Sequence, residues 1–439
     1  MREEEGMSTD TGHTGTSPRI EIQPTDALVD TPVTIRLEGF PAGQQVTVRA
    51  HLVQYLGCPW ESRATFLADA QGRVDVSTQR PVDGTYEQPD PMGLVWSMTP
   101  TVGAALQGSY ITSVAPLQIQ CTAEVNASVV ASAQMERRLL TPQVLRTEVR
   151  TEGLVATLFR PPGAERHPTI VVVGGSCGGL WEAPAALLAS HGFVTLALAY
   201  FGIAPLPPGL VEIPLEYFGT ALRWLQRQEG VNPHAVAVLG QSRGGELALL
   251  LGVTFPDIRA VVAYVPSGVL WMGIPVGGTA HPEPPPAWTW QGRPLPFMRE
   301  GIVGSAIDWA HPPVALAPGY IAALQNCSLV EEATIPVEKT QGPILLISGQ
   351  ADRMSSPRLA EVAVRRAQQH HFAFPIEHVS YPQAGHLLTF PYLPTTLRTG
   401  QHPIRHVDVD YGGTPAGDAF ACADLWPKVV AFLRNNLEP

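Results

Sequence analysis

One stretch, residues 236–251, constrains the fold more than any other part of the chain. It begins with a short apolar run, continues through a Gly-x-Ser-x-Gly sequence at residues 240–244, and ends in an apolar segment of helical character. The glycines allow a tight turn, because they let a strand and a helix approach without a Cβ clash. Such a short pattern also arises by chance in a chain with 41 glycines, so the flanking strand and helix support the interpretation. We expect Ser242 at the carboxyl end of a strand, with its hydroxyl exposed for nucleophilic attack.

The sequence on both sides of this turn alternates between continuous apolar runs and amphipathic segments. The apolar runs cover residues 169–173, 194–198, 260–265 and 343–347, and the helical segments cover 183–190, 215–228 and 357–370. Continuous apolar runs are typical of strands that are buried on both faces of a sheet. Their alternation with helices predicts an α/β fold with a parallel sheet.

An aspartate and a histidine follow two later predicted strands, as the serine follows its own. Asp352 comes after the run 343–347, and His386 comes after the strand predicted at 376–381. The order Ser242, Asp352, His386 is the order of the triad in α/β-hydrolases. A serine hydroxyl needs a base to take its proton, and the histidine needs a carboxylate that fixes its tautomer and offsets its positive charge.

Two alternatives to these partners are weaker. Asp308 could supply the carboxylate, but it lies in a segment that interrupts the α/β alternation. His378 falls inside a predicted strand and is interpreted as structural, whereas His386 stands in a loop with a glycine before it. We therefore expect Ser242, His386 and Asp352 to form the catalytic triad.

A glycine-rich turn at residues 174–179 follows the predicted strand 169–173. It matches neither Gly-x-Gly-x-x-Gly nor the Gly-Lys-Ser/Thr ending of a phosphate-binding loop. Its position before the serine instead fits the loop that supplies part of an oxyanion hole. We expect backbone N–H groups near Ser176 and Cys177, together with that of Arg243, to bind the developing oxyanion. Cys177 could itself be a nucleophile, but it lacks the strand–turn–helix setting and is better explained as a small packed residue.

The remaining segments differ from the α/β part in composition and in the spacing of their apolar residues. Residues 1–17 are polar and aperiodic and are expected to be disordered. Residues 18–145 contain short alternating strands separated by turn residues, which predicts an immunoglobulin-like β-sandwich. Residues 146–439 are assigned to the catalytic domain. Within it, residues 267–340 are rich in proline and tryptophan and are predicted to form a lid.

Composition excludes several classes of protein. The formal net charge is −11 and only 15% of residues are charged, which argues against nucleic acid as a partner. The five cysteines are scattered without Cys-x-x-Cys spacing, so neither a disulfide framework nor a metal site is expected, and no cofactor motif is present. No apolar run reaches the length of a membrane span, and the first residues lack a signal-peptide core, so a cytoplasmic protein is expected.

Longer strings resemble the acyl-CoA thioesterase / bile acid-CoA:amino acid N-acyltransferase family over nearly the whole chain. These strings are residues 19–24, 32–36 and 90–98 in the first part, and 178–182, 188–202, 214–218 and 384–394 in the second. The resemblance implies a β-sandwich followed by an α/β-hydrolase domain, with Ser242, Asp352 and His386 as the triad. It also implies cleavage of acyl-CoA thioesters or acyl transfer from them to an amino acid. Two positions depart from the family pattern: Arg243 replaces an apolar residue, and the tryptophan that usually follows the acid is missing after Asp352.

The identity of the nucleophile favours hydrolysis over transfer. The transferase members carry cysteine at the turn, and a cysteinyl thioester stays activated toward an amine, whereas a seryl ester is less reactive. We therefore expect an acyl-CoA thioesterase that converts fatty acyl-CoA to free fatty acid and CoA through an acyl-serine intermediate. The alternatives are a carboxylesterase that acts on oxygen esters, an acyl-CoA:amino acid N-acyltransferase, and a catalytically silent binding protein.

Overall fold

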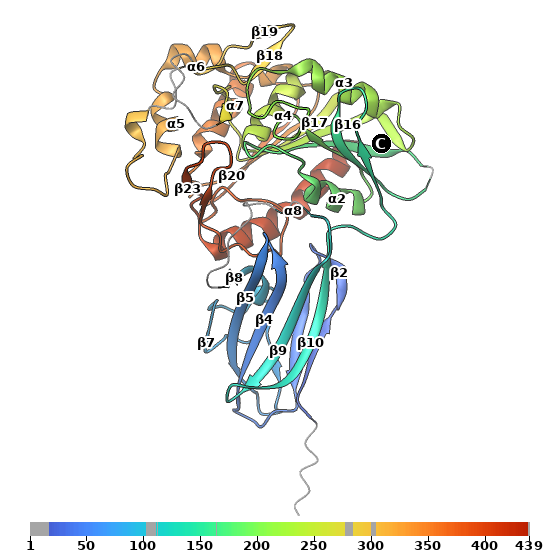
Figure 1. The fold of residues 1–439 in the computed structure, drawn as a ribbon, viewed down its shortest axis with the longest axis vertical. Coiled ribbons are helices and arrows are strands. Elements are labelled where there is room, and N and C mark those ends of the chain that lie inside the picture. Colours follow the sequence, from blue (N-terminus) through green and yellow to red (C-terminus); the bar gives the residue numbers. More distant parts are fainter. Residues whose placement is uncertain are drawn as a thin grey trace, which may run out of the picture.

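The computed structural model describes residues 17–101, 111, 113–163, 165–276, 284–299 and 304–437. The tail predicted at residues 1–17 lies outside the described residues apart from Ser17. A β-rich N-terminal part forms the narrow lower half of the molecule, and a larger α/β part forms the upper half (Figure 1).

The N-terminal part is built from two sheets. Its elements are β1 (Arg19–Gln23), β2 (Asp26–Leu28), β3 (Thr34–Glu38), β4 (Gln45–Tyr55), β5 (Cys58–Leu67), β6 (Val74–Asp75), β7 (Asp83–Gly84), α1 (Gly93–Trp96), β8 (Thr99–Pro100), β9 (Leu117–Val125) and β10 (Ser128–Arg138). One sheet has the order β1-β3-β6, and the other has the order β2-β10-β9-β4-β5-β7, with β8 also paired to β5. Alternate residues of β3 and β4, such as Ile35, Leu37, Val46 and Val48, are buried in one shared core, as the period of two predicts.

This part differs in detail from the strands expected there. Strand β2 runs parallel to β10, whereas the strands of the expected immunoglobulin-like sandwich are antiparallel. The two β sheets agree with the expected β-rich class, and the immunoglobulin-like topology and the domain boundaries stay predictions.

The α/β part is organised around an eight-stranded sheet with helices on both faces, which confirms the predicted fold class. The strands are β11 (Leu145–Val149), β12 (Val155–Arg160), β13 (His167–Val173), β14 (Val194–Ala199), β16 (Val231–Gln241), β17 (Ile258–Tyr264), β20 (Ile344–Gly349) and β21 (Ile376–Tyr381). Their order is β11-β12-β14-β13-β16-β17-β20-β21. Pairing is antiparallel between β11 and β12 and between β12 and β14, and parallel across the rest. This open, mostly parallel sheet has the architecture of an α/β-hydrolase.

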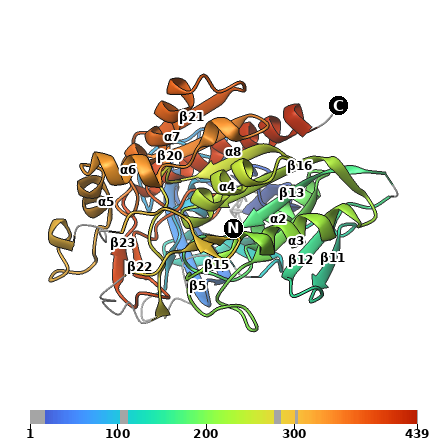
Figure 2. The same cartoon turned by 90° about the horizontal axis from the view of Figure 1, so that it is seen from above.

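The buried strands supply side chains alternately to two cores. In β13, Ile170 and Val172 face one core while Val171 and Val173 face the other. Helices α2 (Glu182–Ser190) and α8 (Pro415–Leu437) pack on the first face, and α3 (Leu215–Gln226), α4 (Arg243–Thr254) and α7 (Pro357–Gln369) pack on the second. Figure 1 shows α3, α4 and α7 above the sheet and α2 and α8 below it, toward the N-terminal part, and Figure 2 looks onto the face that carries α3 and α4. The continuous apolar runs of the sequence are therefore explained by burial on both faces.

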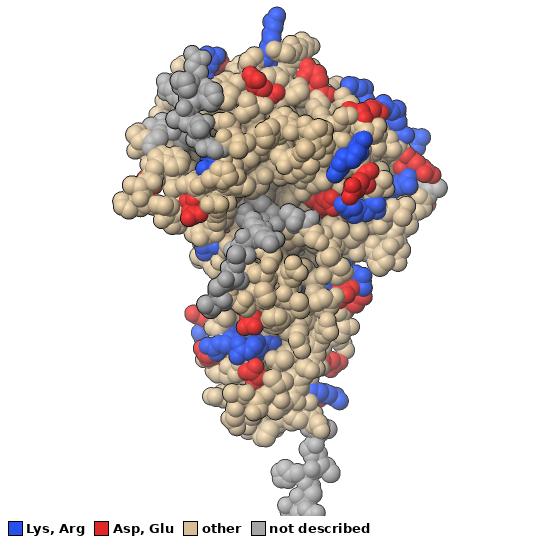
Figure 3. Space-filling model, viewed as in Figure 1, with Lys and Arg blue, Asp and Glu red and all other residues tan. Residues whose placement is uncertain are grey.

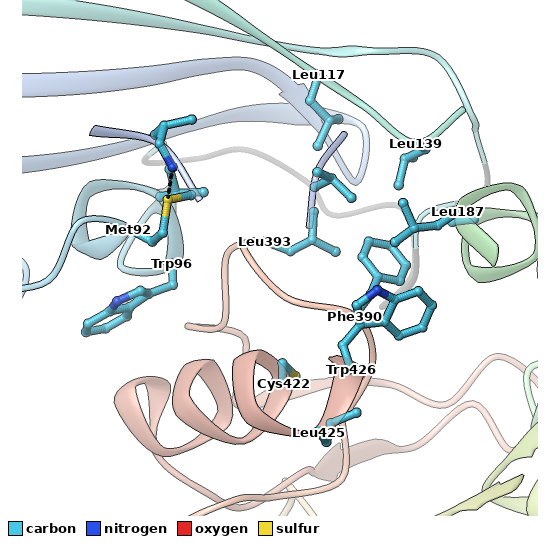
Figure 4. Packing of buried hydrophobic residues seen from close by; sticks show 14 of the residues in the cluster. Met92, Trp96, Leu117, Leu139, Leu187, Phe390, Leu393, Cys422, Leu425 and Trp426 are labelled. Atoms are coloured by element: carbon cyan, nitrogen blue, oxygen red, sulfur yellow. Dashed lines mark hydrogen bonds between the residues drawn. The ribbon is translucent and has the colours of Figure 1, made fainter. Parts of the chain in front are cut away.

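The two parts of the molecule share one of these cores. Side chains of the β-rich part, such as Met92 and Leu117, lie in the same buried cluster as Phe390 and Trp426 of the α/β part (Figure 4). One buried carboxylate also joins them, because Asp30 accepts a hydrogen bond of 2.8 Å from the indole of Trp426 and lies 2.5 Å from His191 Nε2. A shared apolar core of this kind holds the two parts in a fixed arrangement.

Among the described residues, no helix is both long and apolar enough to cross a membrane. On the face shown in Figure 3, basic and acidic side chains lie intermixed and much of the surface carries neither.

Candidate active site

The turn after β16 has the strained geometry that was expected of a nucleophile elbow. Ser242 has φ of 56° and ψ of −119°, and it directly precedes helix α4. A Cβ on Gly240 would stand 1.9 Å from the carbonyl oxygen of Gly244, and a Cβ on Gly244 would stand 2.3 Å from that of Gly174. Larger residues are therefore sterically excluded at both positions, which explains the two glycines around the serine.

The structure brings Ser242, His386 and Asp352 into one hydrogen-bonded chain. The hydroxyl of Ser242 lies 3.1 Å from His386 Nε2, and His386 Nδ1 lies 2.8 Å from Asp352 Oδ2. The three residues follow β16, β21 and β20, whose carboxyl ends meet at one edge of the parallel sheet. The histidine and aspartate are buried, while the serine is partly exposed.

The carboxylate of Asp352 is held in one orientation. Its Oδ1 accepts hydrogen bonds from the backbone N–H groups of Met354 (2.7 Å) and Ser355 (2.8 Å), which leaves Oδ2 for the imidazole. The alternative acid, Asp308, is exposed and pairs with His311. Likewise, His378 bonds to Ser348, as expected for a structural histidine.

The loop that carries His386 is fixed from two sides. Gln241, the neighbour of the serine, donates hydrogen bonds to the carbonyls of His386 (3.5 Å) and Leu388 (3.0 Å). On the other side, Asp418 accepts one of 2.7 Å from the N–H of Gly385 and pairs with the guanidinium of Arg398. Gln241 and Asp418 therefore position the imidazole without touching it.

The predicted oxyanion residues are placed differently from one another. The glycine-rich loop lies against the elbow, because a Cβ on Gly175 would stand only 3.2 Å from Cβ of Ser242. Ser176 lines the same cavity as Ser242, whereas Cys177 is not among the described residues that line it. Arg243 is the first residue of α4. The first N–H groups of a helix have no acceptor within that helix, so the backbone N–H of Arg243 has none within α4.

Ser176 has an unexpected partner in His402. The Nδ1 atom of His402 accepts from the backbone N–H groups of Ile404 (3.3 Å) and Arg405 (3.2 Å), so the ring proton must be on Nε2. That Nε2–H donates to the hydroxyl of Ser176 at 3.0 Å. Burial, with a further contribution from the charge of Arg405, lowers the pKa of His402 to about 3, which keeps this ring neutral. The hydroxyl proton of Ser176 is therefore free to point away from His402.

A buried arginine–glutamate pair follows the nucleophile in helix α4. Arg243 Nη1 stands 3.2 Å from Glu246 Oε2, and both side chains are almost fully buried. The other Glu246 oxygen accepts a hydrogen bond of 2.8 Å from the indole of Trp288. Burial raises the pKa of Glu246 to about 7, although Arg243 and Trp288 act in the opposite direction.

This raised pKa predicts a pH-dependent loss of stability that Glu246→Gln removes. Between the ordinary value of 4.5 and about 7 the folded protein keeps a proton that the unfolded chain has released. The free energy of unfolding should therefore fall as pH rises through this window, by as much as about 3 kcal/mol from this group. The test is urea unfolding of wild type and Glu246→Gln at pH 5 and at pH 7.5. Between these two pH values the free energy of unfolding should fall more in wild type than in the variant. Equal shifts in both proteins would contradict this account.

The cavity beside Ser242 is formed by several segments that are distant in the sequence. The segment between β17 and β20 contributes Ser267, Trp271, Ile274, Leu316 and Tyr320 to its lining. Of the tryptophans in this segment, Trp271 and Trp288 are buried, while Trp309 is largely exposed. The segment therefore covers the site, and its action as a lid stays a prediction; its residues 277–283 and 300–303 lie outside the described residues.

Sequence reasoning missed several residues that shape this site, namely Gln241, Glu246, His402, Arg405 and Asp418. Glu246 sits within the elbow helix and gave a weak signal, as a charged residue in an apolar run. His402 and Arg405 stand between β22 (Thr399–Gln401) and β23 (Asp408–Asp410), in a stretch without a motif. In the part of the chain that the structure describes, no group of three or more histidine, cysteine or acidic residues is arranged to hold a metal ion.

The fold and the elbow define this protein as an α/β-hydrolase. Comparison with known proteins narrows this class. The family model described as "BAAT / Acyl-CoA thioester hydrolase C terminal" matches residues 213–439, and that of the "Acyl-CoA thioester hydrolase/BAAT N-terminal region" matches residues 30–151. The chain therefore belongs to the acyl-CoA thioester hydrolase/BAAT family, which confirms the resemblance in its sequence.

Relatives in this family match along almost their whole length. Acyl-coenzyme A thioesterase 6 of Mus musculus is 30% identical, over 93% of this chain and 94% of the relative. Mitochondrial acyl-coenzyme A thioesterase 2 of Rattus norvegicus is 30% identical, over 93% and 87%. Bile acid-CoA:amino acid N-acyltransferase of Mus musculus is also 30% identical, over 96% and 98%. This chain is thus similar to two hydrolases and to one transferase.

Proposed function

We propose that the protein is an acyl-CoA thioesterase that hydrolyses fatty acyl-CoA to free fatty acid and CoA through an acyl-serine intermediate. The observation that carries the proposal is the hydrogen-bonded chain from Ser242 through His386 to Asp352. Such a chain activates a serine that would otherwise be too weak a nucleophile. The thioesterase names of the two similar hydrolases support the choice of thioester as substrate.

In the first half of the reaction, the acyl group moves to the serine. His386 Nε2 takes the proton of Ser242 as its oxygen attacks the thioester carbonyl carbon. Asp352 stabilises the imidazolium that forms, and the Nε2 proton then passes to the leaving sulfur as the C–S bond breaks. CoA leaves as a thiol and the serine holds the acyl group as an oxygen ester.

The negative charge on the carbonyl oxygen would be bound beside the elbow. The backbone N–H groups at Arg243, Ser176 and Cys177 are the proposed donors, since α4 begins there and the glycine-rich loop lies against the elbow. The hydroxyl of Ser176 could add a further hydrogen bond, because His402 donates to its oxygen and leaves its proton free.

In the second half, water releases the acid. His386 takes a proton from water, the resulting hydroxide attacks the seryl ester, and the proton returns to Ser242 as the fatty acid leaves. An N-acyltransferase is the second candidate, supported by the similar bile acid-CoA:amino acid N-acyltransferase. Serine at the elbow favours water, since an oxygen ester is less activated than a thioester toward an amine.

The experiment that tests the proposal compares three activities of the purified protein. Thiol release from acyl-CoA should exceed p-nitrophenol release from the ester of the same acid at equal concentration. Adding glycine or taurine should not divert the acyl product to an amide. Activity on oxygen esters alone would indicate a carboxylesterase, amide formation would indicate a transferase, and no turnover of either substrate would indicate a binding protein.

Location of the protein in the cytoplasm stays a prediction.

A further inference from the structure

A second serine–histidine pair lines the cavity beside the proposed triad, and its proton is arranged in the opposite sense. Nδ1 of His402 accepts from two backbone N–H groups of the turn that follows it, so the ring proton is on Nε2 and is donated to Ser176 Oγ at 3.0 Å. In the triad, by contrast, His386 is protonated on Nδ1, toward its carboxylate, and its Nε2 accepts from the nucleophile. His402 therefore cannot take the proton of Ser176, and Ser176 is not a second nucleophile.

The imidazole of His402 is held firmly in this orientation. The backbone N–H of His402 donates to the carbonyl of Val407 (2.8 Å), and its carbonyl accepts from the N–H of His406 (2.8 Å), which closes the hairpin between β22 and β23. The side chain is buried, and burial, with a further contribution from the charge of Arg405, lowers its pKa to about 3. The ring is therefore neutral at neutral pH and donates to Ser176 in a single tautomer.

Ser176 stands in a turn that is fixed against the nucleophile elbow. The N–H of Gly178 closes this turn on the carbonyl of Gly175 (3.2 Å), and a Cβ on Gly175 would stand 3.2 Å from Cβ of Ser242. Among the described residues, the Ser176 hydroxyl has no hydrogen bond other than the one it accepts from His402. Its own proton therefore has no acceptor in the described part of the protein and is available to a ligand in the cavity.

The charge that arises beside Ser242 is negative and transient. It develops on the carbonyl oxygen of the substrate when the serine oxygen adds to the carbonyl carbon. A donor that is already fixed in place stabilises such a charge without the cost of reorganisation. Donation from His402 Nε2 also polarises the Ser176 hydroxyl, which strengthens the hydrogen bond that this hydroxyl gives.

We propose that the hydroxyl of Ser176 is a catalytic side-chain donor of the oxyanion hole and that His402 is its positioning residue. The inference rests on the proposed function and adds one catalytic and one positioning residue to it. In both halves of the reaction Ser176 would donate a hydrogen bond to the oxyanion and keep its proton throughout. The bond would weaken again when the carbonyl re-forms and the thiol or the serine leaves.

Removal of this hydroxyl should affect the transition state and leave substrate binding nearly unchanged. Ser176→Ala is expected to lower kcat for thioester hydrolysis roughly a hundredfold with little change in KM, because one oxyanion donor is lost. Ser176→Thr keeps a hydroxyl and should recover most of this loss. The matched control is Ser348→Ala, which breaks another serine–histidine hydrogen bond, of 2.9 Å to His378. Neither of these two residues is among the described residues that line the cavity, so the control should keep the kcat of wild type.

A double-mutant cycle separates positioning from a purely structural link between the glycine-rich turn and the hairpin. His402→Leu should lower kcat by about tenfold, less than Ser176→Ala, because the hydroxyl remains but is no longer oriented. His402→Gln, whose side-chain N–H is also a donor, should recover part of this loss. Combining His402→Leu with Ser176→Ala should lower kcat no further than Ser176→Ala alone. Equal losses in the two single variants, with equal falls in melting temperature, would show a structural link only and would overturn the inference.

A stable analogue of the oxyanion gives a readout that does not depend on turnover. An alkyl trifluoromethyl ketone reacts with a catalytic serine to form a hemiketal oxyanion. Its inhibition constant should rise in Ser176→Ala by the factor by which kcat/KM falls. An inhibition constant equal to that of wild type, or a folded Ser176→Ala protein that retains the kcat of wild type, overturns the inference. Thermal melting shows which variants are folded, and His402→Leu undergoes the same comparison, so the test does not depend on one variant.

Failure of this inference and failure of the proposed function give different results. Hydrolysis of acyl-CoA by wild type upholds the proposed function even where Ser176→Ala has no effect. Hydrolysis of p-nitrophenyl esters alone would remove the thioesterase proposal, but esters form the same oxyanion, so the loss in Ser176→Ala would still be measured on them. Only the absence of turnover of both substrates would remove both.

Discussion

Replacing Ser242 by alanine is expected to lower kcat for acyl-CoA hydrolysis by at least about a thousandfold. The reason is that serine, histidine and aspartate act as one unit, so the loss of the nucleophile removes nearly the whole contribution of the set. The fold should survive, because the serine side chain is partly exposed and, among the residues that the structure describes, its hydroxyl bonds only to His386. Thiol release at saturating acyl-CoA measures kcat, and unfolding in urea measures stability.

A second serine provides the control for this change. Ser132 is exposed on β10, in the N-terminal part of the molecule, so Ser132→Ala should keep wild-type kcat within about twofold. A Ser242→Ala protein that is folded and still hydrolyses acyl-CoA at a tenth of the wild-type rate or more would show that another group is the nucleophile.

Asp352→Asn is expected to lower kcat by about ten-thousandfold while leaving the structure intact. The two N–H groups of Met354 and Ser355 bind Oδ1, so an asparagine would place its carbonyl oxygen there and its NH₂ group toward the imidazole. His386 Nδ1 would then have to accept a hydrogen bond, and its proton would move to Nε2. In that tautomer the ring cannot take a proton from Ser242.

The alternative acid is the natural control for this prediction. Asp308 is exposed and bonded to His311, so Asp308→Asn should change kcat by less than about twofold. Equal losses in the two variants, or no loss in Asp352→Asn, would contradict the assignment of Asp352. The kcat of each variant should be measured at near-neutral and at alkaline pH, because an effect of the tautomer persists at every pH where the imidazole is neutral.

The arrangement of Ser242, His386 and Asp352 could be predicted because each stands at the end of an apolar run. Parallel strands bring their carboxyl ends to one edge of the sheet, so residues that are far apart in sequence are expected together once the strands are recognised. Two glycines at the serine turn added a steric constraint that is local in sequence. The fold class followed from the same alternation of strands and helices.

Other features of the site depend on contacts between segments that are distant in the sequence, and a local sequence pattern does not reveal such contacts. His402 and Arg405 reach the cavity from a short hairpin, and neither is marked by spacing or by an apolar flank. Asp418 lies on helix α8 and supports the loop that carries His386. These two segments are separate in the sequence and meet only in the folded protein. In the N-terminal part, the parallel pairing of β2 with β10 was missed because strand direction depends on the path of the chain and not on alternation.

The most direct test of the account is to identify the residue that carries the acyl group during turnover. Wild-type protein is mixed with acyl-CoA, quenched in acid within one turnover, digested and analysed by mass spectrometry. The account predicts the mass of the acyl group on the peptide that contains Ser242, and its absence from Ser242→Ala. An acyl group on Cys177, or hydrolysis at the full rate with no modified Ser242, would contradict it.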